Sequence, residues 1–186
     1  SDREITVQGG LGGAGGALYV EGQDTVISNS DFLYAASVNY GGAIYIDGNN
    51  TQLIGSTFAN CSTTAYNGGS IFVKGANTTI ADSNFSYNKV NVANAAHGGS
   101  IEIQGDDTKI LNSTVDYCMA YNGGVIYIAG DNAVIDGSTL THSNATSAGG
   151  AIYVAGKNAT ISNSTLNFNG ARDNGGAIYV AGDDAK

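Results

Sequence analysis

A double glycine followed by a small residue and three strand-forming residues recurs seven times in the 186-residue chain. No other feature limits the possible folds as strongly. The successive copies begin 25 to 30 residues apart, a period typical of proteins built from stacked structural repeats. The copies are GGALYV at 15, GGAIYI at 41, GGSIFV at 68, GGSIEI at 98, GGVIYI at 123 and GGAIYV at 149 and 175.

Within each repeat, residue types recur at fixed distances from a third glycine that stands seven positions after the first. The fifth residue after it is Ile or Leu, the eighth is Ser and the tenth is large and apolar, as at Phe32 and Phe58. The seventh is Asn, Asp or Gly, which tolerate a left-handed backbone and therefore predict a tight corner. The third glycines are Gly22, Gly48, Gly75, Gly105, Gly130, Gly156 and Gly182.

Three short alternating segments per repeat, with no helical periodicity, predict an all-β fold: a single-stranded parallel β-helix of about seven coils. We expect one domain over residues 1–186. A leucine-rich repeat is excluded because its leucine consensus is missing, and a propeller blade because one repeat is too short for four strands. Repeat length varies only between the tenth position and the next double glycine, which predicts one loop corner with its longest excursion at 86–97.

The composition excludes several function classes. The formal charge is −9 and only 12% of residues are charged, so we expect neither nucleic-acid binding nor attraction to an anionic lipid surface. No run of 18 apolar residues occurs, which argues against membrane insertion. The charged opening Ser1-Asp2-Arg3-Glu4 is unlike a signal peptide and predicts a mature or excised segment.

The motifs GGAI, at 41–44, 149–152 and 175–178, and FxxN, at Phe85 to Asn88, carry a family resemblance. The chain resembles the adhesin-like surface proteins of methanogenic archaea and, more distantly, the polymorphic outer-membrane proteins of chlamydiae. LNFN at 166–169 is a near match to the second motif, whereas other repeats replace its Asn. The resemblance implies an extracellular or cell-surface β-helix used for adhesion or as structural material, without cofactor chemistry.

Catalysis finds little support in the residues. Parallel β-helices include polysaccharide lyases, which need calcium-binding carboxylates beside a basic residue on one strand surface. Here the acidic pairs Asp106-Asp107 and Asp183-Asp184 share a turn with Asn49-Asn50, which favours a turn-capping ladder over weak calcium binding. His97 and His142 lack partners at coil spacing, so we expect loop or surface roles, no metal site and no enzyme.

One column of aromatic residues is the most function-like feature. Strand alternation points Ile44 and Ile46 inward and Tyr45 outward, and the same holds in each repeat. Outward rings at coil spacing could stack on sugar rings, or could stabilise the sheet without any ligand. An ice-binding surface is disfavoured because paired outward threonines are missing. The candidate binding residues are Tyr19, Tyr45, Phe72, Tyr127, Tyr153 and Tyr179, interrupted by Glu102.

Two further expectations concern modification. Eight Asn-x-Ser/Thr sequons occur, and we expect any glycans on Asn60 and Asn144 in the variable corner and on Asn84 on an outward strand. Cys61 and Cys118 lie two coils apart, roughly 10 Å at about 4.8 Å per rung, which is beyond disulfide reach. Two free thiols are therefore predicted.

The ends of the repeat array suggest self-association. Neither end shows a cap, and uncapped coils expose strand edges that recruit further strands. Joining two copies head to tail places Gly182 and the next Gly15 19 residues apart, against internal spans of 18 to 23. Val7 then falls one residue late, which predicts a local bulge. The sequence predicts a cell-surface filament of this chain; the alternatives are a module of a longer adhesin stalk and a carbohydrate-binding or carbohydrate-active β-helix, with cell-surface glycans or other cells as partners.

Overall fold

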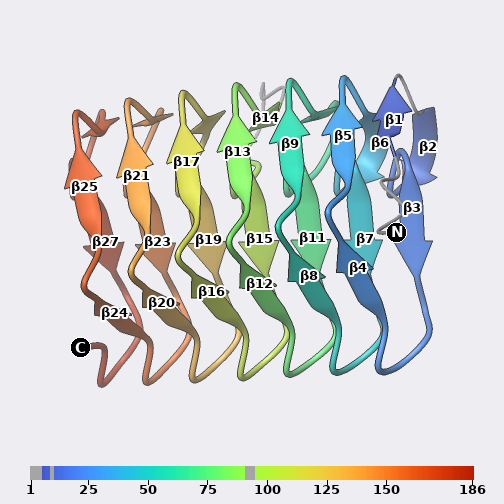
Figure 1. Ribbon diagram of the computed structural model, residues 1–186. Coiled ribbons are helices and arrows are strands. Elements are labelled where there is room, and N and C mark those ends of the chain that lie inside the picture. Colours follow the sequence, from blue (N-terminus) through green and yellow to red (C-terminus); the bar gives the residue numbers. More distant parts are fainter. Residues whose placement is uncertain (1–5, 9–10, 91–94) are drawn as a thin grey trace.

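A computed structural model describes residues 6–8, 11–90 and 95–186 of the chain. The described residues form an all-β parallel solenoid of about six turns, close to the seven coils expected from the repeats. Equivalent strands of successive coils lie side by side along the axis, with β1 to β3 at one end and β24 to β27 at the other (Figure 1). No described helix is long and apolar enough to cross a bilayer.

Four parallel sheets, here named A to D, run the length of the stack. Sheet A contains β1 (Thr6–Gln8), β5 (Asp31–Leu33), β9 (Thr57–Ala59), β13 (Asn84–Ser86), β17 (Thr114–Asp116), β21 (Thr139–Thr141) and β25 (Thr165–Asn167). Sheet B contains β2 (Leu11–Ala14), β6 (Ala36–Tyr40), β10 (Ser62–Thr63), β14 (Lys89–Val90), β18 (Met119–Ala120), β22 (Asn144–Ala145) and β26 (Gly170–Ala171). Sheet C contains β3 (Leu18–Val20), β7 (Ile44–Ile46), β11 (Ile71–Val73), β15 (Ile101–Ile103), β19 (Ile126–Ile128), β23 (Ile152–Val154) and β27 (Ile178–Val180). Sheet D contains β4 (Val26–Ser28), β8 (Gln52–Ile54), β12 (Thr79–Ala81), β16 (Lys109–Leu111), β20 (Val134–Asp136) and β24 (Thr160–Ser162).

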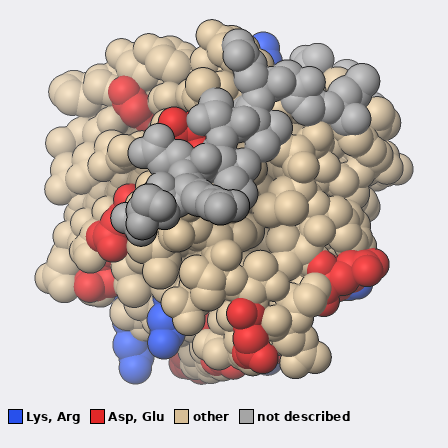
Figure 2. Space-filling model, turned by 45° about the vertical axis from the view of Figure 1, so that its right-hand side comes forward, with Lys and Arg blue, Asp and Glu red and all other residues tan. Residues whose placement is uncertain are grey.

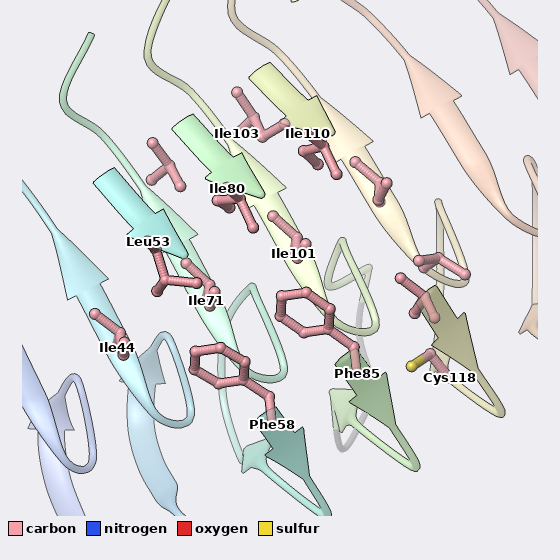
Figure 3. Close-up of a cluster of buried hydrophobic side chains, with 14 of the residues drawn as sticks. Ile44, Leu53, Phe58, Ile71, Ile80, Phe85, Ile101, Ile103, Ile110 and Cys118 are labelled. Carbon is pink, nitrogen blue, oxygen red and sulfur yellow. The ribbon is translucent and has the colours of Figure 1, made fainter. Parts of the chain in front are cut away.

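The core is built from identical positions of successive coils. Figure 3 shows Ile and Leu of sheets C and D facing Phe58 and Phe85 of sheet A across the interior. Phe32, Phe58 and Phe85 stack with ring centroids 4.8 Å apart, one rung per ring. The apolar fifth and tenth positions therefore point inward in the interior coils, where their side chains are almost fully buried.

The corners are confirmed as well. The seventh residue after each third glycine has a positive φ, from 47° at Asn29 to 62° at Gly137. At the double glycine, Gly41 has φ +59°, and a Cβ on Gly42 would lie 2.0 Å from the carbonyl oxygen of Gly69 in the next coil. Only glycine lets successive coils approach this closely.

The serines at the eighth position form hydrogen bonds along the axis. The backbone N–H of Ser30 donates to the hydroxyl of Ser56, that of Ser56 to Ser83, and the ladder continues to Ser164 with N···O distances of 3.1 to 3.3 Å. Each serine hydroxyl in turn donates to a carbonyl two residues earlier, as Ser30 does to Ser28 at 2.8 Å. The serine rank thus joins neighbouring coils without leaving unpaired polar groups.

The prediction of three strands per coil is wrong, because the described coils contain four. Sheet B occupies the segment expected to be a variable loop, and its strands are as short as two residues, too short to show alternation. Within the predicted excursion 86–97, Ser86 belongs to β13 and Lys89–Val90 form β14 in register with Ser62 and Thr63. Residues 91–94 of that excursion lie outside the described residues. Length variation is therefore confined to the segment between sheet B and the double glycine.

Candidate functional site

The predicted aromatic residues form a column on the outer face of sheet C, here called the sheet C column. Tyr19 stacks on Tyr45 at 4.8 Å and Tyr45 on Phe72 at 5.2 Å, measured between ring centroids. Beyond Glu102 the column resumes with Tyr127 on Tyr153 at 4.9 Å and ends on Tyr179. The stacking is as predicted.

The exposure expected for this column is wrong at its centre. Tyr45 and Phe72 are 9% and 3% exposed, because Tyr40 from the end of β6 lies over both, 6.2 Å and 4.7 Å away between ring centroids. Tyr19 is exposed, and Tyr127, Tyr153 and Tyr179 are intermediate. A flat, open stripe of rings is thus interrupted, and the predicted sugar-binding role can apply only to the accessible positions at either end.

Glu102 occupies the ring position of the fourth coil and is only 1% exposed. Its Oε1 accepts a hydrogen bond from Gln104 at 2.9 Å, while Oε2 has no partner in the structure. Burial raises the pKa of this carboxyl to about 7, opposed by the hydrogen bond from Gln104. The His97 ring stacks on Tyr127 with ring centroids 4.2 Å apart, and burial lowers the pKa of His97. The centre of the sheet C column is therefore a packed, partly polar interior rather than a surface.

A second column of rings, missed in the sequence, lies at the turn between sheets A and B; we call it the corner column. It occupies the twelfth position after each third glycine, and every member has a positive φ, from 49° to 56°. Tyr87 stacks on Tyr117 at 5.1 Å, Tyr117 on His142 at 4.8 Å and His142 on Phe168 at 5.0 Å. The column consists of Tyr34, Asn60, Tyr87, Tyr117, His142 and Phe168.

The corner column is exposed along its whole length. Tyr34, Tyr87 and Phe168 are 58%, 56% and 80% exposed. A groove of about 480 Å³ opens beside it where Asn60 replaces a ring, with Ser62, Lys89 and Met119 of sheet B along one side. The sequence signal for this column was an aromatic residue or His at the twelfth position of five of the six repeats. It was missed because aromatic residues do not favour turns and because Asn60 interrupts the pattern.

Charged side chains are scattered sparsely over the face seen in Figure 2. The predicted turn-capping ladder is confirmed: the Asn50 amide donates to Asp24, Asn77 to Asn50, and Asn132 to Asp107, at 2.9 to 3.1 Å. Among the described residues, no group of three or more His, Cys, Asp or Glu side chains is placed to hold a metal ion. These turn carboxylates thus have a structural role in joining coils.

His142 does not stand alone, contrary to the sequence reading. Its Nδ1 lies 2.9 Å from Oδ1 of Asp116 in the preceding coil, and the Thr141 hydroxyl donates to the same oxygen at 2.8 Å. The ring is also part of the corner column. Its surface location is as expected.

The three predicted glycosylation residues all have exposed side chains. Asn84 lies on β13 of sheet A, Asn60 at the corner with φ +56°, and Asn144 on β22 of sheet B rather than in a loop. Occupancy by glycans stays a prediction for each of them.

The thirteenth position of each coil points inward and explains the Asn of the FxxN motif. The Asn88 amide accepts a hydrogen bond from the Cys61 N–H at 2.9 Å and donates to the Phe58 carbonyl at 3.1 Å. Asn169 of LNFN repeats the second bond toward Leu140 at 2.8 Å. Cys61 and Cys118, on either side of Asn88, are free, as predicted. Both are buried, and burial raises the pKa of each thiol to about 12.

No protein-family model matches this chain, and no curated protein or solved structure is significantly similar to it. Its function is therefore argued from the geometry above.

Proposed function

We propose that this chain is a non-enzymatic structural and adhesive protein of the cell exterior whose copies associate head to tail into a filament. The supporting observation is that strand pairing joins successive coils in all four sheets, and that rings of equivalent positions stack from coil to coil in sheets A and C. Such contacts are additive along the axis, so a further coil gains the same ladder bonds and stacking as an internal one.

The ladders extend to the described C-terminal face. Ile161, Leu166 and Ile178 are only partly buried there, although their equivalents in interior coils are fully buried. Ala185 packs on this core, and the Lys186 N–H donates to the Ala159 carbonyl at 2.8 Å, which begins another rung of sheet D. At the opposite face, Val7 pairs with Phe32, so β1 occupies the tenth-position rung of sheet A. An incoming copy that continued the coil would place its β1 in sheet A directly after the sheet D rung that begins at Lys186.

The next coil could come from a second copy of this chain or from the continuation of a longer chain. The isolated 186-residue protein forms fibres in the first case and stays monomeric in the second. Head-to-tail association predicts fibres in electron micrographs with an axial repeat of roughly 34 Å, seven coils at about 4.8 Å each. Sedimentation as an 18.8 kDa monomer at high concentration, without fibres, contradicts the filament and leaves the solenoid as a module.

A matched pair of variants tests whether the end face mediates assembly. Leu166→Lys places a charge in the inward rank of β25, and Thr165→Lys places the same charge on the exposed neighbour. We expect Leu166→Lys to abolish fibres and Thr165→Lys to preserve them, because only the first charge would be buried by an incoming coil. Equal effects of the two substitutions would argue against axial stacking.

A further inference from the structure

The interruption of the corner column at Asn60 leaves a slot between two exposed rings. Strand register places Leu33, Ala59 and Ser86 on successive rungs, so the residues that follow them, Tyr34, Asn60 and Tyr87, also occupy successive rungs. At about 4.8 Å per rung, Tyr34 and Tyr87 are roughly 9.6 Å apart. Elsewhere in the column, rings stack at 4.8 to 5.1 Å, so the slot has room for one additional ring with a stacking partner on each side.

The walls and floor of the slot favour a sugar over other rings. The faces of a pyranose present C–H groups that pack on aromatic rings, and its hydroxyls require hydrogen-bond partners at the edge. The exposed Asn60 carboxamide and the Ser62 hydroxyl both line the groove and can supply such partners.

The positive charge of Lys89 restricts the charge of the ligand. Lys89 lines the groove and forms no ion pair with any described residue, in a chain with only seven Lys and Arg against sixteen Asp and Glu. An ammonium without an ion-pair partner among the described residues, placed beside a ring slot, favours a carboxylate-bearing ligand and disfavours a cation such as a quaternary ammonium.

We propose that Tyr34 and Tyr87 sandwich one uronic-acid ring of an acidic polysaccharide above Asn60, with Lys89 pairing the carboxylate. This site lies on the side of the solenoid and needs no neighbouring copy, so it is independent of head-to-tail association. It gives the adhesive part of the proposed function a ligand class on a surface other than the predicted sheet C column.

Calorimetric titration of the protein, produced in a host without N-glycosylation, with a galacturonic-acid tetramer tests the site. A neutral galactose tetramer is the matched ligand. We expect the acidic tetramer to bind roughly tenfold more tightly than the neutral one, and Lys89→Gln to abolish that difference. Equal affinities for the two tetramers, or an unchanged preference in Lys89→Gln, would overturn the assignment of Lys89.

Asn60→Tyr closes the slot while keeping the fold, because Tyr already occupies this turn at Tyr34 and Tyr87 with φ of 56° and 55°. We expect it to eliminate binding, whereas His142→Tyr, in the same column but outside the groove, leaves affinity unchanged. Binding by Asn60→Tyr at wild-type affinity sinks the proposal, as does no binding by the wild type. Circular dichroism and electron microscopy of the same samples report fold and fibre formation separately, so failure here does not count against the filament.

The sequon at Asn60 offers a second source of the same sugar chemistry. Mass spectrometry of protein from its native source distinguishes the two. A bare Asn60 supports an external ligand, and a fully occupied Asn60 overturns it, because the attached sugar would fill the slot.

Discussion

The sheet C column and the corner column place rings at the same spacing but in opposite environments. Ring centroids lie about 5 Å apart in both, yet Phe72 is 3% exposed and Tyr87 is 56% exposed. The difference arises because Tyr40 and His97, each directly before a double glycine, pack over rings of sheet C. At the turn between sheets A and B, the rings are exposed and no described residue covers them. A repeated ring by itself therefore does not identify a binding surface, since its cover comes from a part of the coil that does not repeat.

Gly42→Ala should have the largest effect, because both columns depend on coil spacing. The new Cβ would lie 2.0 Å from the Gly69 carbonyl oxygen and 2.7 Å from backbone atoms of Ser62, none of which can move alone. We expect a loss of about 4 kcal/mol or more in the free energy of unfolding, measured by urea denaturation. Gly13→Ala is the control, since a Cβ there meets nothing within 4 Å and should be nearly neutral. Comparable losses in both variants would refute the close-approach argument.

Truncating a ring to Ala should lower the free energy of unfolding much more in the sheet C column than in the corner column. Phe72→Ala removes a buried ring that contacts Tyr45 and Tyr40, and we expect a loss of about 3 to 4 kcal/mol. Tyr87→Ala removes an exposed ring, with an expected loss below about 1 kcal/mol. Denaturation curves of both variants under one condition check this ranking, and a reversed order would mean that burial does not distinguish the columns.

The pH dependence of stability should be specific to the sheet C column. Burial raises the pKa of Glu102 from 4.5 to about 7, so between these values the folded state binds more protons than the unfolded state. Stability from this group is full below about pH 4.5 and falls as pH rises to about 7, by roughly 3 kcal/mol in total. His97 acts in the opposite direction, because its pKa is lowered, and it is present in every variant compared.

Glu102→Gln should remove this loss. We expect the variant and the wild type to have similar unfolding free energies near pH 4.5 and the variant to be more stable at pH 8. Denaturation at both pH values tests the expectation, and parallel pH profiles would show that Glu102 ionises freely in the folded protein.

Asn60→Tyr should have the smallest effect on stability. It adds a ring between Tyr34 and Tyr87, and exposed ring pairs across neighbouring strands contribute about 0.2 to 1 kcal/mol each. A small rise in melting temperature is expected, measured beside the binding experiment above. A clear fall would mean that the Tyr34 and Tyr87 rings do not flank an open slot.

Prediction from the sequence succeeded where a feature is local and repeats. The left-handed corner at Asn29 and its equivalents, the turn-capping ladder and the two unpaired thiols all follow from residue type at a fixed distance from glycine. Each depends only on its own coil and the next, and every coil gives the same evidence again.

The fourth sheet, the cover over the sheet C column and the exposed corner column could not be obtained in the same way. Two-residue strands such as Ser62–Thr63 carry no alternation, and their pairing appears only when coils are stacked. The burial of Glu102 could not be inferred from the other coils, because each of them has an aromatic ring at this position. Periodicity thus specifies the backbone path and the core, because they are made of local, repeated contacts. Which outward residues face solvent depends on packing between non-repeating segments, and that is fixed only in three dimensions.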